Sequence, residues 1–466
     1  MENFNFWDSE VWGSLNLVAV LLASLLLANS LKKLIPFLKR SLIPSSVLGG
    51  LILLTASVIY ERITGCTLFN TPFFGGDGSA TLEILTYHCL ALGFIATSLK
   101  SSEEKFGKQR RREIFDMGVS TVSSYLLQGI LGLGISYLAS LIVPKLFPAA
   151  GILLPFGYGQ GTGQALNYGN IYENDFGFVG GRSFGLTIAA FGFLSAAIGG
   201  VIHLNILRKK GAQYQWDAAE RADTLTLSDI QTADEIPMNG SIDKLTMQLV
   251  LIFLTYLMTY GIIALLGSLV GSLRSILFGF NFLIGVLMAG LVKTVNRLLM
   301  KKGLVNHQHI NGFLMTRLSG FFFDIMIIAG VAAIRINVLK DYWVLILLLG
   351  FIGALATYFY CQMFSRKLFP DYAEEQFMVS YGMLTGTAST GIILLRELDP
   401  DYKTPAAENL VYQNFPAMVF GFPMMLLATL APVKPLLTLI ILIVFFFIME
   451  IILFRNQLAK KLKRKK

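Results

Sequence analysis

The chain carries little charge for its length. Only 14% of its 466 residues are Asp, Glu, Lys or Arg, whereas about 25% is usual in a soluble domain. Its three cysteines and four histidines lack the spacing of a disulfide framework or a metal-ligand cluster. No Ser–His, Cys–His or His–acid grouping stands out, which argues against an enzyme. We therefore expect no cofactor and no metal centre.

Long apolar runs take the place of charge, and 54% of the residues are hydrophobic. Eleven runs have about the 20 residues needed to cross the hydrocarbon core of a bilayer. They lie near 12–30, 43–61, 80–99, 116–143, 179–207, 245–268, 275–296, 312–334, 342–365, 405–432 and 435–454. The net charge of +9 does not indicate a nucleic-acid partner, because the bases lie in loops beside these runs. The sequence predicts an all-α polytopic membrane protein.

Two short patches rich in glycine and hydroxyl side chains interrupt the apolar pattern. The first is FGYGQGTGQALNYG, from Phe156 to Gly169, and the second is YGMLTGTASTGIIL, from Tyr381 to Leu394. At an offset of 225 residues, three pairs coincide: Gly157 with Gly382, Gly161 with Gly386 and Thr162 with Thr387. Unwound segments at matching places in two halves of a membrane protein are typical of the binding site of a secondary transporter.

The basic residues predict how the chain crosses the membrane. Thirty of the 38 Lys and Arg residues lie in alternate loops that include the central segment and the carboxyl tail, and only six lie in the loops between. Cytoplasmic loops accumulate Lys and Arg, so the amino terminus is expected outside and the carboxyl terminus inside. This asymmetry arises only if each patch is a re-entrant hairpin that enters and leaves on one side.

The halves then have opposite orientations, which predicts inverted repeats of five spans, each with a hairpin before its fifth span. The expected organisation is a first repeat at 1–207 with a hairpin at about 150–172, a cytoplasmic linker at 208–244, a second repeat at 245–432 with a hairpin at about 376–397, and an extra span and basic tail at 433–466.

Both patches contain groups that suit a carboxylate and a small cation. Freed backbone N–H groups with a helix N-terminus behind them favour anions, and freed carbonyls with hydroxyls are hard oxygen ligands. The polar side chains are Gln160, Thr162, Gln164 and Asn167 in the first patch, and Thr385, Thr387, Ser389 and Thr390 in the second. Two such tips that meet would bind a carboxylate together with a cation.

Several polar residues in the spans are further candidates, because burying a charge in lipid is costly. Asp324 could take part in cation binding, although with Arg317 seven residues earlier it could equally form a structural polar pair. Arg182 follows the first patch and could neutralise a carboxylate. Asn414 opens the tenth span and is a cation-site candidate.

Four motifs resemble the bacterial glutamate:sodium symporter family, over roughly residues 12–430. They are IPSSVLGGLIL (Ile43 to Leu53), LALGFIATSLK (Leu90 to Lys100), GQGTGQA in the first patch, and TIAAFGFLSAAIGG (Thr187 to Gly200). The resemblance implies a homodimeric elevator transporter of the bacterial cytoplasmic membrane, in which a domain carrying both hairpins slides past a fixed scaffold. It also implies import of L-glutamate with sodium as the coupling ion.

The motifs and the resemblance together define two sets of candidate site residues. The substrate set is Gly159, Gly161, Thr162, Gly163, Gln164, Asn167, Arg182, Gly386, Thr387, Ser389 and Thr390. The cation set is Thr162, Asn167, Thr385, Thr387, Asp324 and Asn414.

Two other functions stay open. The second patch, TGTASTG, departs from the glycine–alanine–threonine–proline tip associated with well-known members of the family. A symporter for another carboxylate, such as a 2-hydroxycarboxylate or a dicarboxylate, is therefore the main alternative. An anion channel would need a continuous pore lined by charged or carbonyl rings, which the few intramembrane bases do not favour.

Overall fold

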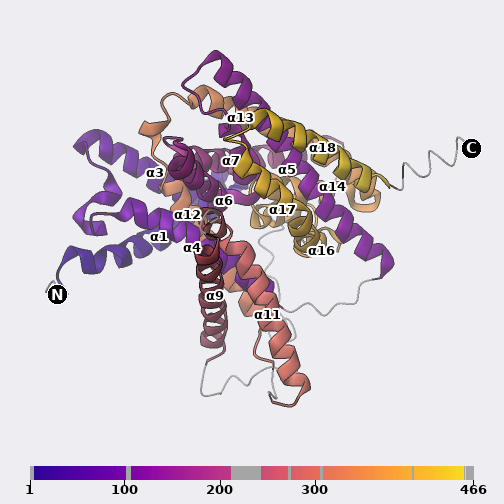
Figure 1. The fold of residues 1–466 in the computed structure, drawn as a ribbon, viewed down its shortest axis with the longest axis horizontal. Coiled ribbons are helices and arrows are strands. Elements are labelled where there is room, and N and C mark those ends of the chain that lie inside the picture. Colours follow the sequence, from indigo (N-terminus) through magenta and orange to yellow (C-terminus); the bar gives the residue numbers. More distant parts are fainter. Residues whose placement is uncertain are drawn as a thin grey trace, which may run out of the picture.

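The computed structural model describes residues 5–100, 107–210, 243–270, 274–304, 308–400, 403–455 and 457. These residues form α-helices joined by turns and short 3₁₀ segments (Figure 1). The helices are α1 (Ser9–Leu34), α2 (Pro36–Arg40), α3 (Ser45–Thr64), α4 (Gly78–Leu99), α5 (Lys108–Ile142), α6 (Leu153–Phe176), α7 (Gly181–Lys209), α9 (Lys244–Leu269), α10 (Arg274–Gly279), α11 (Asn281–Lys301), α12 (Gly312–Ala332), α13 (Trp343–Leu368), α14 (Ala373–Thr385), α15 (Ala388–Arg396), α16 (Ala406–Tyr412), α17 (Asn414–Leu430) and α18 (Pro435–Leu453).

The all-helical, polytopic architecture predicted from the sequence is confirmed. Ten of the described helices are long and apolar enough to cross a membrane, and an eleventh span results if the bent pair α16–α17 counts as one. Large apolar side chains point outward from these helices, as on α9, where Phe253 is 52% exposed and Leu257 is 65% exposed. Lipid would cover such faces. Most of the predicted linker at 208–244 and of the basic tail lies outside the described residues.

Two predicted spans differ from the structure in a break or a bend, and each difference has a physical cause. The run at 275–296 is broken after Gly279, whose carbonyl oxygen accepts a hydrogen bond from Asn167 Nδ2 and so has a partner outside its own helix. The run at 405–432 bends by 52° between α16 and the part of α17 that begins at Pro416. Proline cannot donate a helical hydrogen bond and clashes with the preceding turn, so a bend here is expected.

The two halves of the chain pack in matching ways. Helix α4 lies antiparallel against α12, where Thr97 Oγ1 and Ser319 Oγ are 2.6 Å apart. Helix α3 packs on α12 as α11 packs on α4, and α1 pairs with α3 as α9 pairs with α11. In Figure 1, α9 and α11 extend side by side away from the other helices.

A second group of helices surrounds α5 and α13, which also run antiparallel. Gln128 Nε2 on α5 donates to Thr357 Oγ1 on α13 over 2.9 Å. The last helix, α18, packs on α5 and α17. Its end is held by an ion pair of 2.8 Å between Arg455 and Asp116, at the start of α5. The extra span predicted at the carboxyl end is thus part of this group.

Candidate functional site

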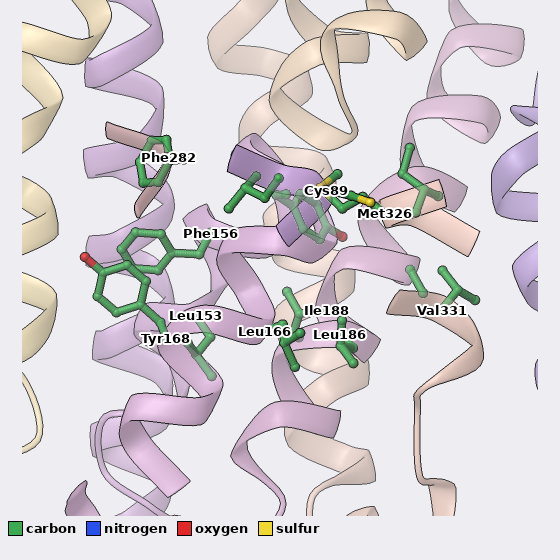
Figure 2. Close-up of a cluster of buried hydrophobic side chains, with 14 of the residues drawn as sticks. Cys89, Leu153, Phe156, Leu166, Tyr168, Leu186, Ile188, Phe282, Met326 and Val331 are labelled. Atoms are coloured by element: carbon green, nitrogen blue, oxygen red, sulfur yellow. The ribbon is translucent and has the colours of Figure 1, made fainter. Parts of the chain in front are cut away.

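The first glycine patch forms a helical hairpin, residues 150–176. Helix α6 is interrupted at Gly161, where φ is 78° and ψ is −169°, a conformation that is essentially restricted to glycine. The chain reverses there. This is seen from the ring of Phe156, before the break, which stacks on that of Tyr168, after it, with centroids 3.9 Å apart (Figure 2). Beyond the two arms, Phe147 stacks on Phe178 at 4.6 Å. Both ends of this hairpin therefore lie at the same level of the molecule.

The second patch forms another helical hairpin, residues 373–396, built from α14 and α15. The arms approach so closely that a Cβ atom on Gly382 would lie 2.7 Å from the Cα atom of Gly391. At the turn, Thr387 caps α15, since its Oγ1 accepts a hydrogen bond of 3.4 Å from the backbone N–H of Thr390. Glycines on facing positions thus permit the tight pairing, and a threonine starts the returning helix.

The tips of the two hairpins are in contact. A Cβ atom on Gly161 would lie 3.3 Å from Cγ2 of Thr387 and 3.8 Å from the carbonyl oxygen of Gly386. Thr162 Oγ1, beside the first tip, donates a hydrogen bond of 3.3 Å to the carbonyl oxygen of Met326 on α12. The fold therefore brings together two segments that are far apart in the sequence, and the first of them packs on α12.

A cavity of about 180 Å³, the tip cavity, lies at this junction. The hairpins contribute Gly159, Gln160, Met383, Thr387, Ala388 and Ser389. The helices around them contribute Leu90, Phe94, Thr97, Tyr125, Phe282, Phe323, Met326, Gln413, Asn414, Ala417, Met418, Gly421 and Met425. No charged side chain stands among these lining residues. Polar contacts within the cavity come from hydroxyls, amides and backbone groups.

Several predicted site residues lie at or beside the tip cavity. Gly159, Thr387, Ser389 and Asn414 line it, and Gly161, Thr162 and Gly386 form the tips behind it. Gly163 packs against Leu90 on α4. Two predicted hydroxyls are engaged locally: Thr385 Oγ1 donates to the carbonyl oxygen of Tyr381 over 2.6 Å, and Thr390 Oγ1 lies 3.3 Å from Thr387 Oγ1.

Other predicted residues lie away from the tip cavity. Asn167 and Arg182 line a separate cavity of about 510 Å³, the Arg182 cavity, between α4, α6, α7 and α10. Gln164 is buried next to Asn167, whose Nδ2 lies 3.5 Å from Gln164 Oε1. Arg182 is paired with Glu83 at 2.6 Å, and Glu83 is also paired with Arg335 at 2.8 Å. The guanidinium predicted to meet a substrate carboxylate thus meets a protein carboxylate here.

Asp324 faces another helix. Its carboxyl group is hydrogen-bonded by Ser46, near the start of α3. Arg317 lies with its guanidinium carbon 5.0 Å from the centroid of the Phe313 ring. Asp324 is therefore held between α12 and α3, outside the lining of the tip cavity.

The structure also adds residues that were not among the predicted ligands. Tyr125 on α5 lines the tip cavity and donates a hydrogen bond of 3.0 Å to the carbonyl oxygen of Gly159. Gln413, 1% exposed, sits at the bend between α16 and α17 and donates over 3.1 Å to Asn414 Oδ1. In the sequence, the nearby residues Asn414 and Pro416 indicate a polar bend at this place, and Gln413 could have been found from them. Nothing in the sequence around Tyr125 signals its position.

Charged groups gather at the start of the second hairpin. His203 Nε2 on α7 lies 2.8 Å from Glu374 Oε2, and Arg366 pairs with the same carboxylate at 3.3 Å. The hydrogen bond from His203 is the main cause that lowers the pKa of the Glu374 carboxyl from its ordinary value, while burial opposes it. This cluster fastens the hairpin to α7 and α13.

The oxygen atoms around the tips are suitable ligands for a hard, weakly held cation. Hydroxyl, amide and carbonyl oxygens are the ligand types that such ions prefer. Within the part of the chain that the structure describes, no group of three or more His, Cys, Asp or Glu side chains could hold a metal ion. The groups available at the tips are thus hydroxyls, amides and backbone carbonyls.

Comparison with known proteins adds one relationship. The family model described as sodium/glutamate symporter matches residues 13–373, well over half of the chain. The match includes the first hairpin and ends at the first residue of α14, where the second hairpin begins. No curated protein gives a match to the chain.

Proposed function

The chain belongs to the sodium/glutamate symporter family, and from this premise we propose that it imports L-glutamate together with sodium by alternating access. The substrate would bind in the tip cavity between the two hairpins. The observation that carries the proposal is that this cavity combines a helix N-terminus with a lining that has no charged side chain.

The start of α15 supplies the anion-binding element. Ala388 and Ser389, its first two residues, line the tip cavity, and Thr387 caps the helix. The first N–H groups of a helix have no partner within it, and the helix dipole favours negative charge at this end. Hydroxyl and amide groups of Ser389, Gln160 and Asn414 surround the same space. A carboxylate would find several donors here without a basic side chain.

The absence of lining charges also supports coupling to a cation. Burying an ionised carboxylate without a counter-charge is costly. At neutral pH glutamate carries a net negative charge, and no Lys or Arg lines the tip cavity to balance it. A sodium ion bound beside it, at hydroxyl and carbonyl oxygens of the tips such as those of Thr162 and Thr387, would supply the missing charge. Substrate and cation would then bind better together than either alone.

The grouping of the helices supports the transport cycle that we propose. The tip cavity is lined by residues of α4, α11 and α12 and by residues of the hairpins, α5 and α17. The matching packing of the two halves supports inverted repeats, with each hairpin re-entrant from one side. An elevator movement of the hairpin group, in a homodimer in the bacterial cytoplasmic membrane, is part of the same proposal.

The central test uses the purified full-length protein in proteoliposomes. Saturable glutamate uptake should require an inward sodium gradient. Equal uptake after sodium is replaced by potassium would overturn the coupling. Competition by aspartate, citrate and malate in the same assay separates glutamate transport from transport of other carboxylates.

The proposed orientation has a direct test in the native chain. Cys66, which follows α3, is exposed, whereas Cys89 and Cys361 are buried. With the amino terminus outside, Cys66 also lies outside, so an impermeant maleimide added to intact cells should label it. Labelling only after the cells are opened would reverse the orientation.

A further inference from the structure

A second feature, unrelated to the tips, is a basic cavity at the end of α11. Lys293, Arg297 and Lys301 follow one another at four-residue spacing and therefore lie along one side of the helix. All three line a cavity of about 320 Å³. The remaining lining residues are Asn296, Met300, Gln308 and Ile310. No acidic side chain is among them.

The position of the basic cavity is set by α4. Lys293 Nζ donates hydrogen bonds of 3.2 Å to the carbonyl oxygen of Ser98 and 3.0 Å to that of Lys100. These carbonyls belong to the last turn of α4 and its cap, so the basic cavity lies where α4 leaves the apolar layer. On the basic-residue asymmetry, this is the cytoplasmic face. In a bilayer, headgroup phosphates lie at the edge of the apolar layer.

The positive charges that line the basic cavity would be stabilised by a bound anion. Like charges four residues apart on a helix repel one another. Within the described residues, the structure shows no ion pair for Arg297 or Lys301, and both are exposed. An anion held by three basic groups and two amides would relieve this repulsion.

Exposed apolar side chains on the same helix indicate what carries the anion. Leu287, Leu291, Val295 and Leu298 share one face of α11 and are 45–60% exposed. We propose that the basic cavity binds the phosphate of an anionic phospholipid, whose acyl chains lie along these apolar side chains. Basic pockets between membrane helices on the cytoplasmic side have the chemistry to hold such headgroups. A free phosphate would gain nothing from the apolar stripe.

The test compares lipid binding by the full-length protein and two charge-matched variants. Arg297→Gln/Lys301→Gln removes two basic side chains from the basic cavity. Arg208→Gln/Lys209→Gln removes two exposed ones from the end of α7 and serves as the control. Bound lipid is measured by native mass spectrometry after titration with phosphatidylglycerol or phosphatidylcholine in detergent, and size-exclusion chromatography checks that each variant is folded.

We expect wild type and the α7 control to bind phosphatidylglycerol in preference to phosphatidylcholine. The α11 variant should bind phosphatidylglycerol roughly thirtyfold more weakly, since it lacks two bases and each base near the surface contributes about 1 kcal/mol. Equal binding by the two variants would overturn the site. Inorganic phosphate that competes fully with phosphatidylglycerol at comparable concentration would overturn the lipid assignment, because the acyl chains would then contribute nothing.

Discussion

Gly161 and Thr387 lie next to each other at the point where the two hairpins meet. A Cβ atom on Gly161 would lie 3.3 Å from Cγ2 of Thr387, although the residues belong to opposite halves of the chain. One supplies a turn that only glycine readily makes, and the other caps the helix that returns from the opposite turn. Changes at either residue should therefore affect the shared cavity before they affect the rest of the fold.

Gly161→Ala should reduce glutamate uptake at least about tenfold. The φ and ψ of Gly161 cost a residue with a Cβ atom on the order of 1–3 kcal/mol, and the new methyl group would press on Thr387. Gly134→Ala on α5 is the matched control, because a Cβ atom there has no neighbour within 4 Å. Uptake is measured in proteoliposomes at equal protein content. Equal loss in both variants would mean that the turn geometry is irrelevant.

Thr387→Val should lower the apparent affinity for sodium and glutamate, whereas Thr387→Ser should preserve both. Valine keeps the shape of threonine but lacks the side-chain oxygen. That oxygen caps α15, and its loss should cost about 1 kcal/mol of stability. The same oxygen is the one that we expect to contact the cation. The measurement is uptake rate against sodium concentration. Wild-type sodium dependence in the valine variant would refute a role for this hydroxyl, and Thr162→Val is tested in the same way.

Gln413→Glu should abolish glutamate uptake at neutral pH, while Gln413→Leu should retain part of it. A carboxylate at this buried position would put a negative charge beside the proposed substrate carboxylates. Two like charges about 4 Å apart repel by about 4 kcal/mol in a partly screened site. Leucine removes the amide but adds no charge. If both variants lose the same amount of uptake, the uncharged character of the tip cavity is not what matters.

Arg182 tests whether the second cavity takes part in substrate binding. If Arg182 serves mainly to neutralise Glu83, then Arg182→Gln should destabilise the protein by about 2 kcal/mol, and the added change Glu83→Gln should restore most of this stability. Thermal unfolding of the single and double variants gives the coupling. A double variant that is stable but does not transport would instead assign Arg182 to the substrate.

The contact of His203 with Glu374 should make stability depend on pH in one direction. The pKa of Glu374 is lowered in the folded chain, so its contribution is complete above the ordinary glutamate pKa of about 4.3. That contribution disappears as the pH falls through the lowered value. Wild type should therefore unfold at a higher temperature than Glu374→Gln at pH 6, and the difference should shrink toward pH 3. A difference that grows on acidification would contradict this assignment.

Much of the architecture follows from local chemistry. Runs of about 20 apolar residues must be helical in a bilayer, since each backbone polar group needs a partner within the segment. The spans at 12–30, 312–334 and 435–454 thus correspond closely to α1, α12 and α18. Two predicted spans contain a break or a bend that the apolar pattern does not show. The carbonyl oxygen of Gly279 accepts a hydrogen bond from Asn167, and α16 meets α17 at an angle.

The candidate site was predictable only in part. Glycine and hydroxyl residues marked both patches, because such residues are needed where a helix is interrupted at membrane depth. No local pattern shows which side chains from other helices complete a cavity. Tyr125 and Gln413, which lie outside both patches, line the tip cavity. Asn167, from the first patch, and Arg182, from the helix after it, line the Arg182 cavity instead.

The sequence by itself determined the class of protein, the approximate positions of most spans and the two glycine patches at which α6 is interrupted and α14 gives way to α15. These features depend on composition and on neighbours along the chain, because a bilayer requires apolar side chains and internally paired backbone groups. Only the tertiary structure decided that the tips meet at Gly161 and Thr387, that Glu83 pairs with Arg182, and that no charged side chain lines the tip cavity. Those facts depend on how helices from both halves pack, and packing joins residues whose separation along the chain carries no signal.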